Sequence, residues 1–147
     1  MPLRSIAAQS RHPFEIFLLG MALVSALPTT LGRAPQPGSI TAQVDPSAAL
    51  AWSIALALGS GIALLGVAWP RPKDDSHMSV TALILEQVGL VTVGVATVFY
   101  VSTICMTVGP SASIPAGLIT AFGASCLWRA WQIQRVLRQI EPGGCNT

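Results

Sequence analysis

Two ionisable side chains lie inside otherwise apolar stretches, and they are the residues best placed to do chemistry. Glu86 lies in the apolar run 80–108, and Arg129 lies in the run 114–133. On helices, Glu86 would lie about 9 Å from the start of its segment, and Arg129 would lie about 6 Å from the end of its own segment. In neighbouring antiparallel helices, that start and that end lie on the same side. If both runs cross a bilayer, we expect the two side chains to form an intramembrane ion pair, because an isolated charge there is costly.

Such a pair has two interpretations. It can be structural, fixing the register of two helices while Arg129 reaches toward the headgroups, or it can belong to an ion or proton pathway. Glu15 and Arg11 are expected nearby at the membrane interface. A pathway needs polar groups that continue toward the far side, and the run 80–108 offers hydroxyls without a further carboxylate or histidine: Thr92, Thr97, Ser102, Thr103 and Thr107. The structural interpretation is therefore favoured.

The other groups that could react do not indicate a catalytic or metal site. His77 follows Asp74 and Asp75 in a short loop, where a solvated turn is more typical than the ligand set that a metal requires. His12 stands alone before a proline. Because the chain has only 2 histidines, no Ser/His/Asp or Cys/His set can be assembled. We predict no enzymatic activity, no cofactor and no metal.

The composition indicates a membrane protein. Charged residues make up 10% of the 147 residues, whereas soluble domains carry about 25%. The mean hydropathy is +0.62. The 3 cysteines, Cys105, Cys126 and Cys145, are too few and too scattered for a disulfide framework. Cys126 is expected to be a small packing residue, and the state of Cys145 stays open. No basic cluster with interleaved aromatics indicates nucleic acid as a partner.

Four segments meet or approach the roughly 20 residues that a helix needs to cross a bilayer core of about 30 Å. They are residues 14–31, 48–69, 80–108 and 114–133. The breaks between them carry helix signals: Asp45 and Pro46 read as an N-cap and first helical residue, and Gly109-Pro110 ends the third segment. The sequence therefore predicts an all-α fold, a four-helix transmembrane bundle that forms one domain over residues 1–147.

The first segment has a second interpretation as a secretory signal peptide. Residues 24–26 resemble a small-residue cleavage site, and Arg4 and Arg11 would form the charged region before it. Glu15 at the opening of the apolar run, and the length of the charged region, favour a retained span. Whether this segment is cleaved stays open.

The basic residues predict an orientation. Seven of the 8 Lys and Arg residues fall on one side of the four segments, and Arg33 falls alone on the other. The seven are Arg4, Arg11, Arg71, Lys73, Arg129, Arg135 and Arg138. Because positive charge collects on the cytoplasmic side, we expect both termini in the cytoplasm and the protein in the cytoplasmic membrane.

Small residues recur at four-residue spacing and predict helix contacts. In lipid, helices associate through small residues that let their backbones approach. The predicted packing residues are Ala51, Ala55, Gly59 and Ala63 in the second segment and Gly117, Ala121 and Ser125 in the fourth. The second set leads to Arg129, which we expect to face a helix.

The end of the fourth segment is predicted to continue as an amphipathic helical arm over residues 134–141. Ile133, Val136, Leu137 and Ile140 follow helical spacing, while Arg135 and Arg138 lie on other faces. Such an arm can lie on anionic headgroups or pair with another helix. Arg135 and Arg138 are therefore candidates for binding the membrane surface or a partner.

Both ends of the apolar region resemble a known group of proteins. The stretches 11–17 (RHPFEIF) and 127–133 (LWRAWQI) are similar to the ends of small four-span proteins encoded by phages of actinobacteria. The resemblance implies a viral or prophage origin and a host cytoplasmic membrane location, and it carries over no catalytic residue.

The sequence thus predicts a non-enzymatic multi-pass membrane protein with a helix-packing, interaction or membrane-organising role. Its expected partners are the lipid bilayer and either further copies of itself or another membrane protein. A holin-like pore former is the first alternative, because small size, several spans and a basic tail are typical of holins. A small transporter or channel subunit is the second, although it would need a continuous polar face.

Overall fold

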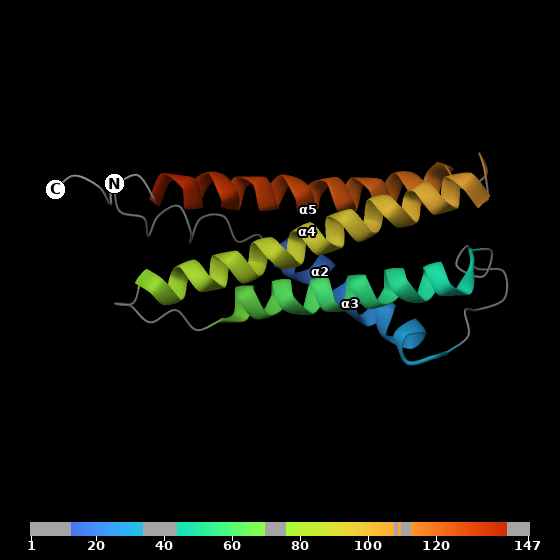
Figure 1. Ribbon diagram of the computed structural model, residues 1–147, viewed down its shortest axis with the longest axis horizontal. Helices are drawn as coiled ribbons and strands as arrows, with labels where there is room; N and C mark the ends of the chain where they lie inside the picture. Colours follow the sequence, from blue (N-terminus) through green and yellow to red (C-terminus); the bar gives the residue numbers. More distant parts are fainter. Residues whose placement is uncertain (1–12, 34–43, 70–75, 108, 110–112, 141–147) are drawn as a thin grey trace.

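The computed structural model describes residues 13–33, 44–69, 76–107, 109 and 113–140. These residues form four α-helices and no β-strand, which confirms the all-α prediction (Figure 1). The helices are α2 (Pro13–Thr30), α3 (Pro46–Ala68), α4 (Ser76–Thr107) and α5 (Ser113–Ile140). Their bounds lie close to the predicted segments, and α5 continues without a break into the predicted arm.

Local sequence explains where the helices begin and end. Asp45 is the N-cap of α3: its Oδ2 accepts hydrogen bonds from the backbone N–H of Ser47 at 3.0 Å and of Ala48 at 3.2 Å, and from the Ser47 hydroxyl. Pro46 occupies the first helical turn, where its missing N–H leaves no bond unmade. The predicted cap is therefore confirmed. After α2, Gly32 adopts φ +75°, a conformation in which a side chain would be strained.

Two of the helical segments are long and apolar enough to cross a membrane, not the four that were expected. They are Pro46–Ala68 and Val80–Thr107, in α3 and α4. The apolar part of α2, Ile16–Thr30, is shorter, about 22 Å along its axis. In α5 the apolar run is interrupted by Arg129 and leads into a polar second half that contains glutamines and further arginines.

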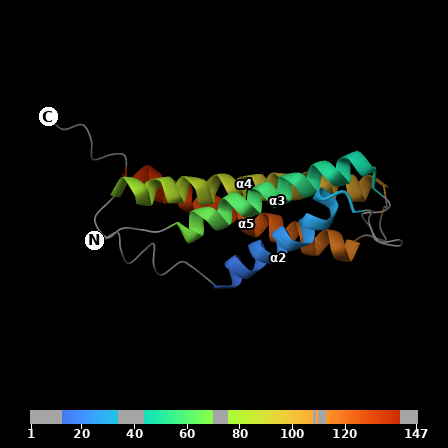
Figure 2. The same cartoon turned by 90° about the horizontal axis from the view of Figure 1, so that it is seen from below.

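The helices alternate in direction, and α4 lies between α3 and α5. Figures 1 and 2 show α3, α4 and α5 running alongside one another, with α2 inclined against α3. The extensive contacts are those of α3 with α4, α4 with α5 and α2 with α3. Contacts between α2 and α5 are few, so the bundle is held together mainly through its two middle helices.

The contact between α3 and α4 is made by small residues and leaves no room for larger ones. A Cβ atom added to Gly66 would lie 2.6 Å from the backbone nitrogen of Glu86, and one added to Gly89 would lie 2.6 Å from the carbonyl oxygen of Gly59 and 2.8 Å from the Cα of Ala63. We call Gly59, Ala63, Gly66 and Gly89 the glycine seam. Backbones that approach this closely gain dispersion contacts over their whole surface.

The seam corrects the predicted packing residues of α3. Gly59 and Ala63 are buried as expected, but Ala55 is only half-buried and Ala51 is exposed. A strict four-residue step turns about 40° away from a fixed helix face, so three steps carry Ala51 well away from Ala63. The buried positions alternate steps of four and three residues: Ala49, Ser53, Leu56, Ser60 and Ala63.

The same drift makes the prediction for α5 wrong within this chain. Gly117, Ala121 and Ser125 are all exposed, and a Cβ added to Gly117 would meet no atom within 4 Å. The small residue through which α5 approaches α4 is Gly123, where an added Cβ would lie 2.8 Å from Thr97 Cγ2.

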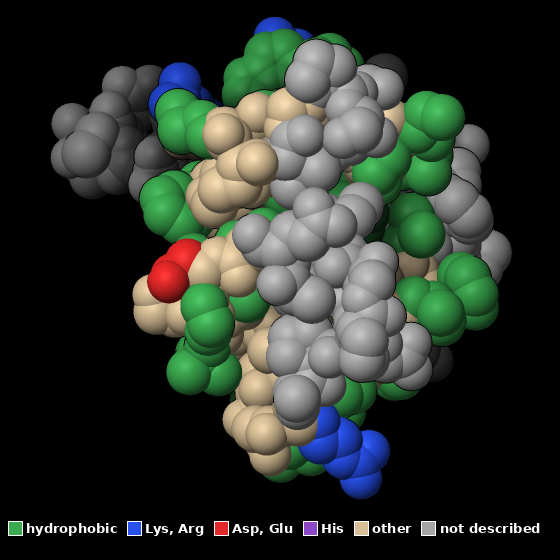
Figure 3. All heavy atoms as spheres, turned by 90° about the vertical axis from the view of Figure 1, so that its right-hand side faces the viewer, with side chains coloured by type: hydrophobic (Ala, Val, Ile, Leu, Met, Phe, Trp, Pro, Cys, Tyr) green, Lys and Arg blue, Asp and Glu red, His purple; other side chains and the backbone are tan. Residues whose placement is uncertain are grey.

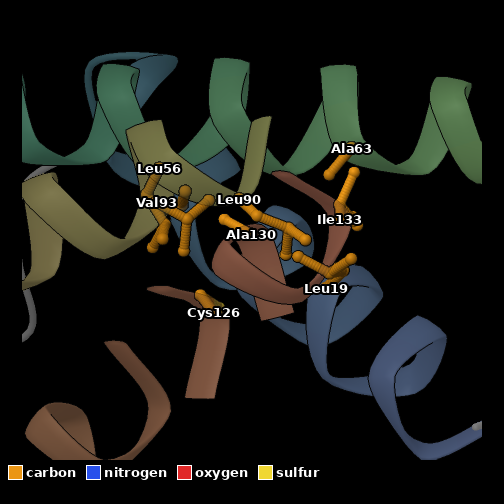
Figure 4. Close-up of a cluster of buried hydrophobic side chains, with 9 residues drawn as sticks. Leu19, Leu56, Ala63, Leu90, Val93, Cys126, Ala130 and Ile133 are labelled. Atoms are coloured by element: carbon orange, nitrogen blue, oxygen red, sulfur yellow. The ribbon is translucent and has the colours of Figure 1, made fainter. Parts of the chain in front are cut away.

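The interior has two hydrophobic clusters. In the main one, Leu56, Leu90, Val93 and Ala130 come from three helices and point toward one another, and Leu19 of α2 joins them (Figure 4). The second cluster contains Val44, Tyr100 and Ile104. At its edge, the rings of Trp52 and Tyr100 stack with centroids 3.9 Å apart and an interplanar angle of 12°.

We predict that Gly66→Ala lowers the thermal stability of the purified protein in detergent. The new methyl group would overlap the backbone of α4, and overpacking of this kind typically costs about 1–3 kcal/mol. The control is Gly61→Ala, because an added Cβ there meets no atom within 4 Å and alanine is the better helix former. Thermal unfolding followed by circular dichroism measures both; equal losses in the two variants would contradict the seam.

We also predict a pH-dependent contribution from the cap of α3. The hydrogen bond from the Ser47 side chain, with those from the backbone of Ala48 and Ser47, holds the pKa of Asp45 below its ordinary value of 3.8. A carboxyl with a lowered folded-state pKa stabilises the fold above its unfolded-state pKa, and the stabilisation is lost as the pH falls through the folded-state value.

Wild type should therefore unfold at a higher temperature than Asp45→Asn near neutral pH. The difference should shrink as the pH is lowered below 3.8, because asparagine keeps an acceptor oxygen but carries no charge to lose. A difference between the two melting temperatures that stays constant down to about pH 2 would show that the charge of Asp45 contributes nothing.

Candidate functional site

The structure brings Glu86 and Arg129 together between α4 and α5. Arg129 Nη2 lies 3.5 Å from Glu86 Oε1, and the side chains are 14% and 5% exposed, respectively. This separation is longer than the roughly 2.7–2.9 Å of a short charge-assisted hydrogen bond. The pair is thus an electrostatic contact through one oxygen and one nitrogen, shielded from the surroundings by the helices that carry it.

The position of Glu86 follows from the glycine seam. Its backbone nitrogen lies against Gly66 of α3, so α3 occupies one side of this turn of α4. The carboxylate reaches the opposite neighbour, α5, where Arg129 lies one residue before the buried Ala130 and one turn before the buried Ile133. The partners are therefore positioned by two separate helix contacts.

The surroundings of the pair are apolar. Leu90, one turn beyond Glu86, belongs to the main hydrophobic cluster together with Cys126, Ala130 and Ile133 of α5. A single charge buried in such a place is strongly unfavourable, whereas a pair has its desolvation offset by mutual attraction. This geometry favours the structural interpretation of the pair, in which it fixes which turns of α4 and α5 lie side by side.

The hydroxyl groups of α4 do not form a continuous buried row beyond the pair. Thr97 is buried, but Thr92 and Thr103 are only half-buried and Ser102 and Thr107 are exposed. All five donate to carbonyl oxygens of their own helix, four residues back. Each of these hydroxyls therefore has a hydrogen-bond acceptor within its own helix.

Two further hydroxyls lie inside the bundle on α3. Ser53 donates to the carbonyl oxygen of Ala49 at 2.8 Å. The Ser60 hydroxyl is completely buried and has no hydrogen-bond partner among the described residues. The interior of the bundle therefore contains a few buried hydroxyls and an ion pair among its hydrophobic clusters.

The predicted surface arginines are exposed on α5. Arg135 and Arg138 both face outward, and the Cζ atom of Arg135 lies 3.5 Å from the centre of the Trp131 ring. Trp131 in turn contacts Trp128, with ring centroids 5.0 Å apart. Cys126 is buried, as predicted for a packing residue, and Cys105 is exposed.

Several predicted residues cannot be placed. Those outside the described residues are Arg4, Arg11, His12, Arg71, Lys73, Asp74, Asp75 and Cys145; for Glu15, His77, Val136 and Ile140 the helix is described but not the side chain. No three of the His, Cys, Asp and Glu side chains that the structure describes lie together as metal ligands.

The predicted packing residues include none of Gly66, Gly89, Gly94 and Gly123. An added Cβ on Gly94 would lie 2.6 Å from Leu127 Cδ2, so each of these four glycines marks a close helix contact. The available signal was the alternation of four- and three-residue steps, as in Gly59, Ala63 and Gly66, which keeps residues on one face of a helix.

Comparison of the chain with protein-family models, with curated proteins and with solved structures gives no match.

We predict that Glu86 and Arg129 are energetically coupled. Glu86→Gln or Arg129→Gln alone would leave one buried charge without its partner, which typically costs about 3–5 kcal/mol in a protein interior. The double variant removes both charges and should recover much of the loss. A double-mutant cycle on thermal stability in detergent measures the coupling. Losses that simply add in the double variant would show that the two residues act independently.

Proposed function

We propose that this chain is a non-enzymatic integral membrane protein in which all four helices cross the bilayer and act through contacts with lipid and with other membrane helices. One observation carries the proposal: every helix turns large apolar side chains outward. They include Phe17, Met21 and Val24 on α2, Ile54, Leu58 and Leu65 on α3, Val95, Val98 and Phe99 on α4, and Ile114, Leu118 and Trp128 on α5.

The distribution is the reverse of a water-soluble domain. Soluble monomers rarely expose large contiguous apolar patches, yet hydrophobic side chains project around much of the rim of this bundle in the end view (Figure 3). Inside, next to the hydrophobic clusters, α3 and α4 meet closely through glycine and alanine, and a Glu–Arg pair joins α4 to α5. Small and polar contacts inside with apolar side chains outside are what lipid selects.

The two helices that are not long and apolar enough to be identified as spans, α2 and α5, also fit this proposal. The apolar part of α2, Ile16–Thr30, reaches about 22 Å, shorter than the hydrocarbon thickness of about 30 Å, and such a mismatch is accommodated by local thinning of the bilayer. In α5 the charge of Arg129 is opposed by Glu86. The pair therefore removes the main obstacle to placing α5 in lipid.

The distribution of charge supports an orientation with both ends of the chain in the cytoplasm. Arg135 and Arg138 lie in the second half of α5. Arg33, after the C-terminal end of α2, and Asp45, at the N-terminal end of α3, lie at the other end of the bundle. Four antiparallel spans return the chain to the side where it began. A cytoplasmic membrane location then follows from the bias of basic residues toward that side.

The biological role under this proposal is interaction or membrane organisation. The exposed face of α5 that carries Gly117, Ala121 and Ser125 is suited to close approach by another membrane helix, from a second copy or from a different protein.

The topology is tested by cysteine accessibility in a variant whose native cysteines are replaced by serine or alanine. Cysteines introduced at Gln36 and Gln43 should react with a membrane-impermeant maleimide added to intact cells. Cysteines at Ser76 and Asn146 should react only after the membrane is permeabilised. Labelling at Asn146 in intact cells would contradict an even number of spans with cytoplasmic ends.

The same cells distinguish the proposed role from pore formation. Induced expression should leave the membrane potential, measured with a voltage-sensitive dye, unchanged. Collapse of the potential at a defined time after induction would instead favour a holin-like pore former. Full extraction of the protein by alkaline carbonate would show that it is not an integral membrane protein at all.

A further inference from the structure

The outward face of the second half of α5 carries two tryptophans and two arginines. Trp128, Trp131, Arg135 and Arg138 follow steps of three, four and three residues, which place them on one side of a helix. Trp128 is 60% and Trp131 is 40% exposed, and both arginines are exposed. The opposite side of the same turns is buried through Ala130 and Ile133.

The side chains of this face are ordered with respect to one another. The guanidinium carbon of Arg135 lies 3.5 Å from the centre of the Trp131 ring. An arginine that stacks on an aromatic ring uses its flat face for the stack and keeps the N–H groups at its edge for other partners. The Trp131 ring also contacts Trp128, with ring centroids 5.0 Å apart and an interplanar angle of 45°. The ring of Trp131 therefore contacts both Arg135 and Trp128.

The charge of this face is not neutralised within α5. The helix contains no Asp or Glu residue, and the third arginine, Arg129, already faces Glu86 of α4. Two guanidinium groups one helical turn apart therefore offer N–H donors to an anion, and the planar fork of arginine matches the oxygen atoms of a phosphate.

We propose that Trp128, Trp131, Arg135 and Arg138 bind the phosphate of an anionic phospholipid headgroup. The inference rests on the membrane location proposed above. Arg135 lies six residues beyond Arg129, about 9 Å farther along the axis, so the ion pair lies inside the hydrocarbon and Arg135 reaches the headgroups. Trp131 lies between these levels and Trp128 lies at the level of the ion pair, one residue before Arg129; indole rings are favoured near the interface. Along α5 the indole rings come before the two outer guanidinium groups, just as the interfacial layer comes before the headgroups on the way out of a bilayer. This order favours a lipid over a soluble anion as the ligand.

The test is a titration of lipid into the purified full-length protein in detergent, followed by the rise in melting temperature. Phosphatidylglycerol should stabilise at concentrations at least about tenfold lower than phosphatidylcholine does, because each arginine near anionic lipid contributes about 1 kcal/mol, or about fivefold in affinity. Inorganic phosphate at the same concentrations should have no effect.

Variants separate a built site from general attraction to positive charge. Arg135→Gln with Arg138→Gln should weaken the phosphatidylglycerol effect roughly 25-fold, while the control Arg33→Gln, which removes an exposed arginine at the other end of the molecule, should leave it unchanged. Arg135→Lys and Trp131→Leu keep charge or bulk but lose the stack, and each should weaken binding by about two- to fivefold.

Three results would overturn the proposal: equal half-maximal concentrations for the two lipids, equal effects of Arg33→Gln and the double arginine variant, or an equal effect of inorganic phosphate, which would identify a site for a free anion. Resistance of the variants to carbonate extraction is measured in parallel. A protein that stays in the membrane but shows no lipid preference lacks this site and remains a membrane protein, whereas a protein that carbonate extracts fails the proposed function itself.

Discussion

The close approach of α3 and α4 is the constraint on which the rest of the bundle depends. Where Gly66 and Gly89 meet the opposite helix, the structure has no space even for a methyl group, so the distance between the two helices is set by their backbones. In lipid, apolar burial contributes little to helix association, and the gain comes from such continuous contact. A helix pair fixed in this way provides the surface against which α2 packs on one side and α5 on the other.

The seam also explains why a charge can be tolerated beside the hydrophobic cluster. It holds the backbone of Glu86 against Gly66 and leaves the side chain to meet α5. The approach of α5 is fixed independently by Gly94 and Gly123, which receive Leu127 and Thr97. Shape thus decides which helices touch, and the ion pair with Arg129 decides which turns face each other, because any other register would leave a buried charge unopposed.

Features that depend on neighbouring residues, or on the position of a residue along its own helix, could be predicted from the sequence. The four helices, the cap at Asp45, and the similar depths of Glu86 and Arg129 all follow from residues near one another in the chain. The packing faces could not be predicted in the same way, because a four-residue ladder drifts by about 40° at each step and the partner helix decides where it makes contact. Ala63 was therefore identified, while Gly123 was not.

The stacking of Arg135 on Trp131 could not be predicted from the sequence, for a different reason. It depends on side-chain conformation, and spacing alone permits it without requiring it. Once it is formed, α5 has arginines in two distinct states: Arg129 is turned inward and opposed by Glu86, and Arg135 is turned outward and held on an indole ring. About 9 Å of helix separates them. In the proposed membrane location, a slide of α5 by one turn along its axis would separate Arg129 from Glu86 and would also move the indole rings out of the interfacial layer. If α5 crosses the bilayer as we propose, the inner pair and the outer face select the same depth for it, although they contact different surroundings.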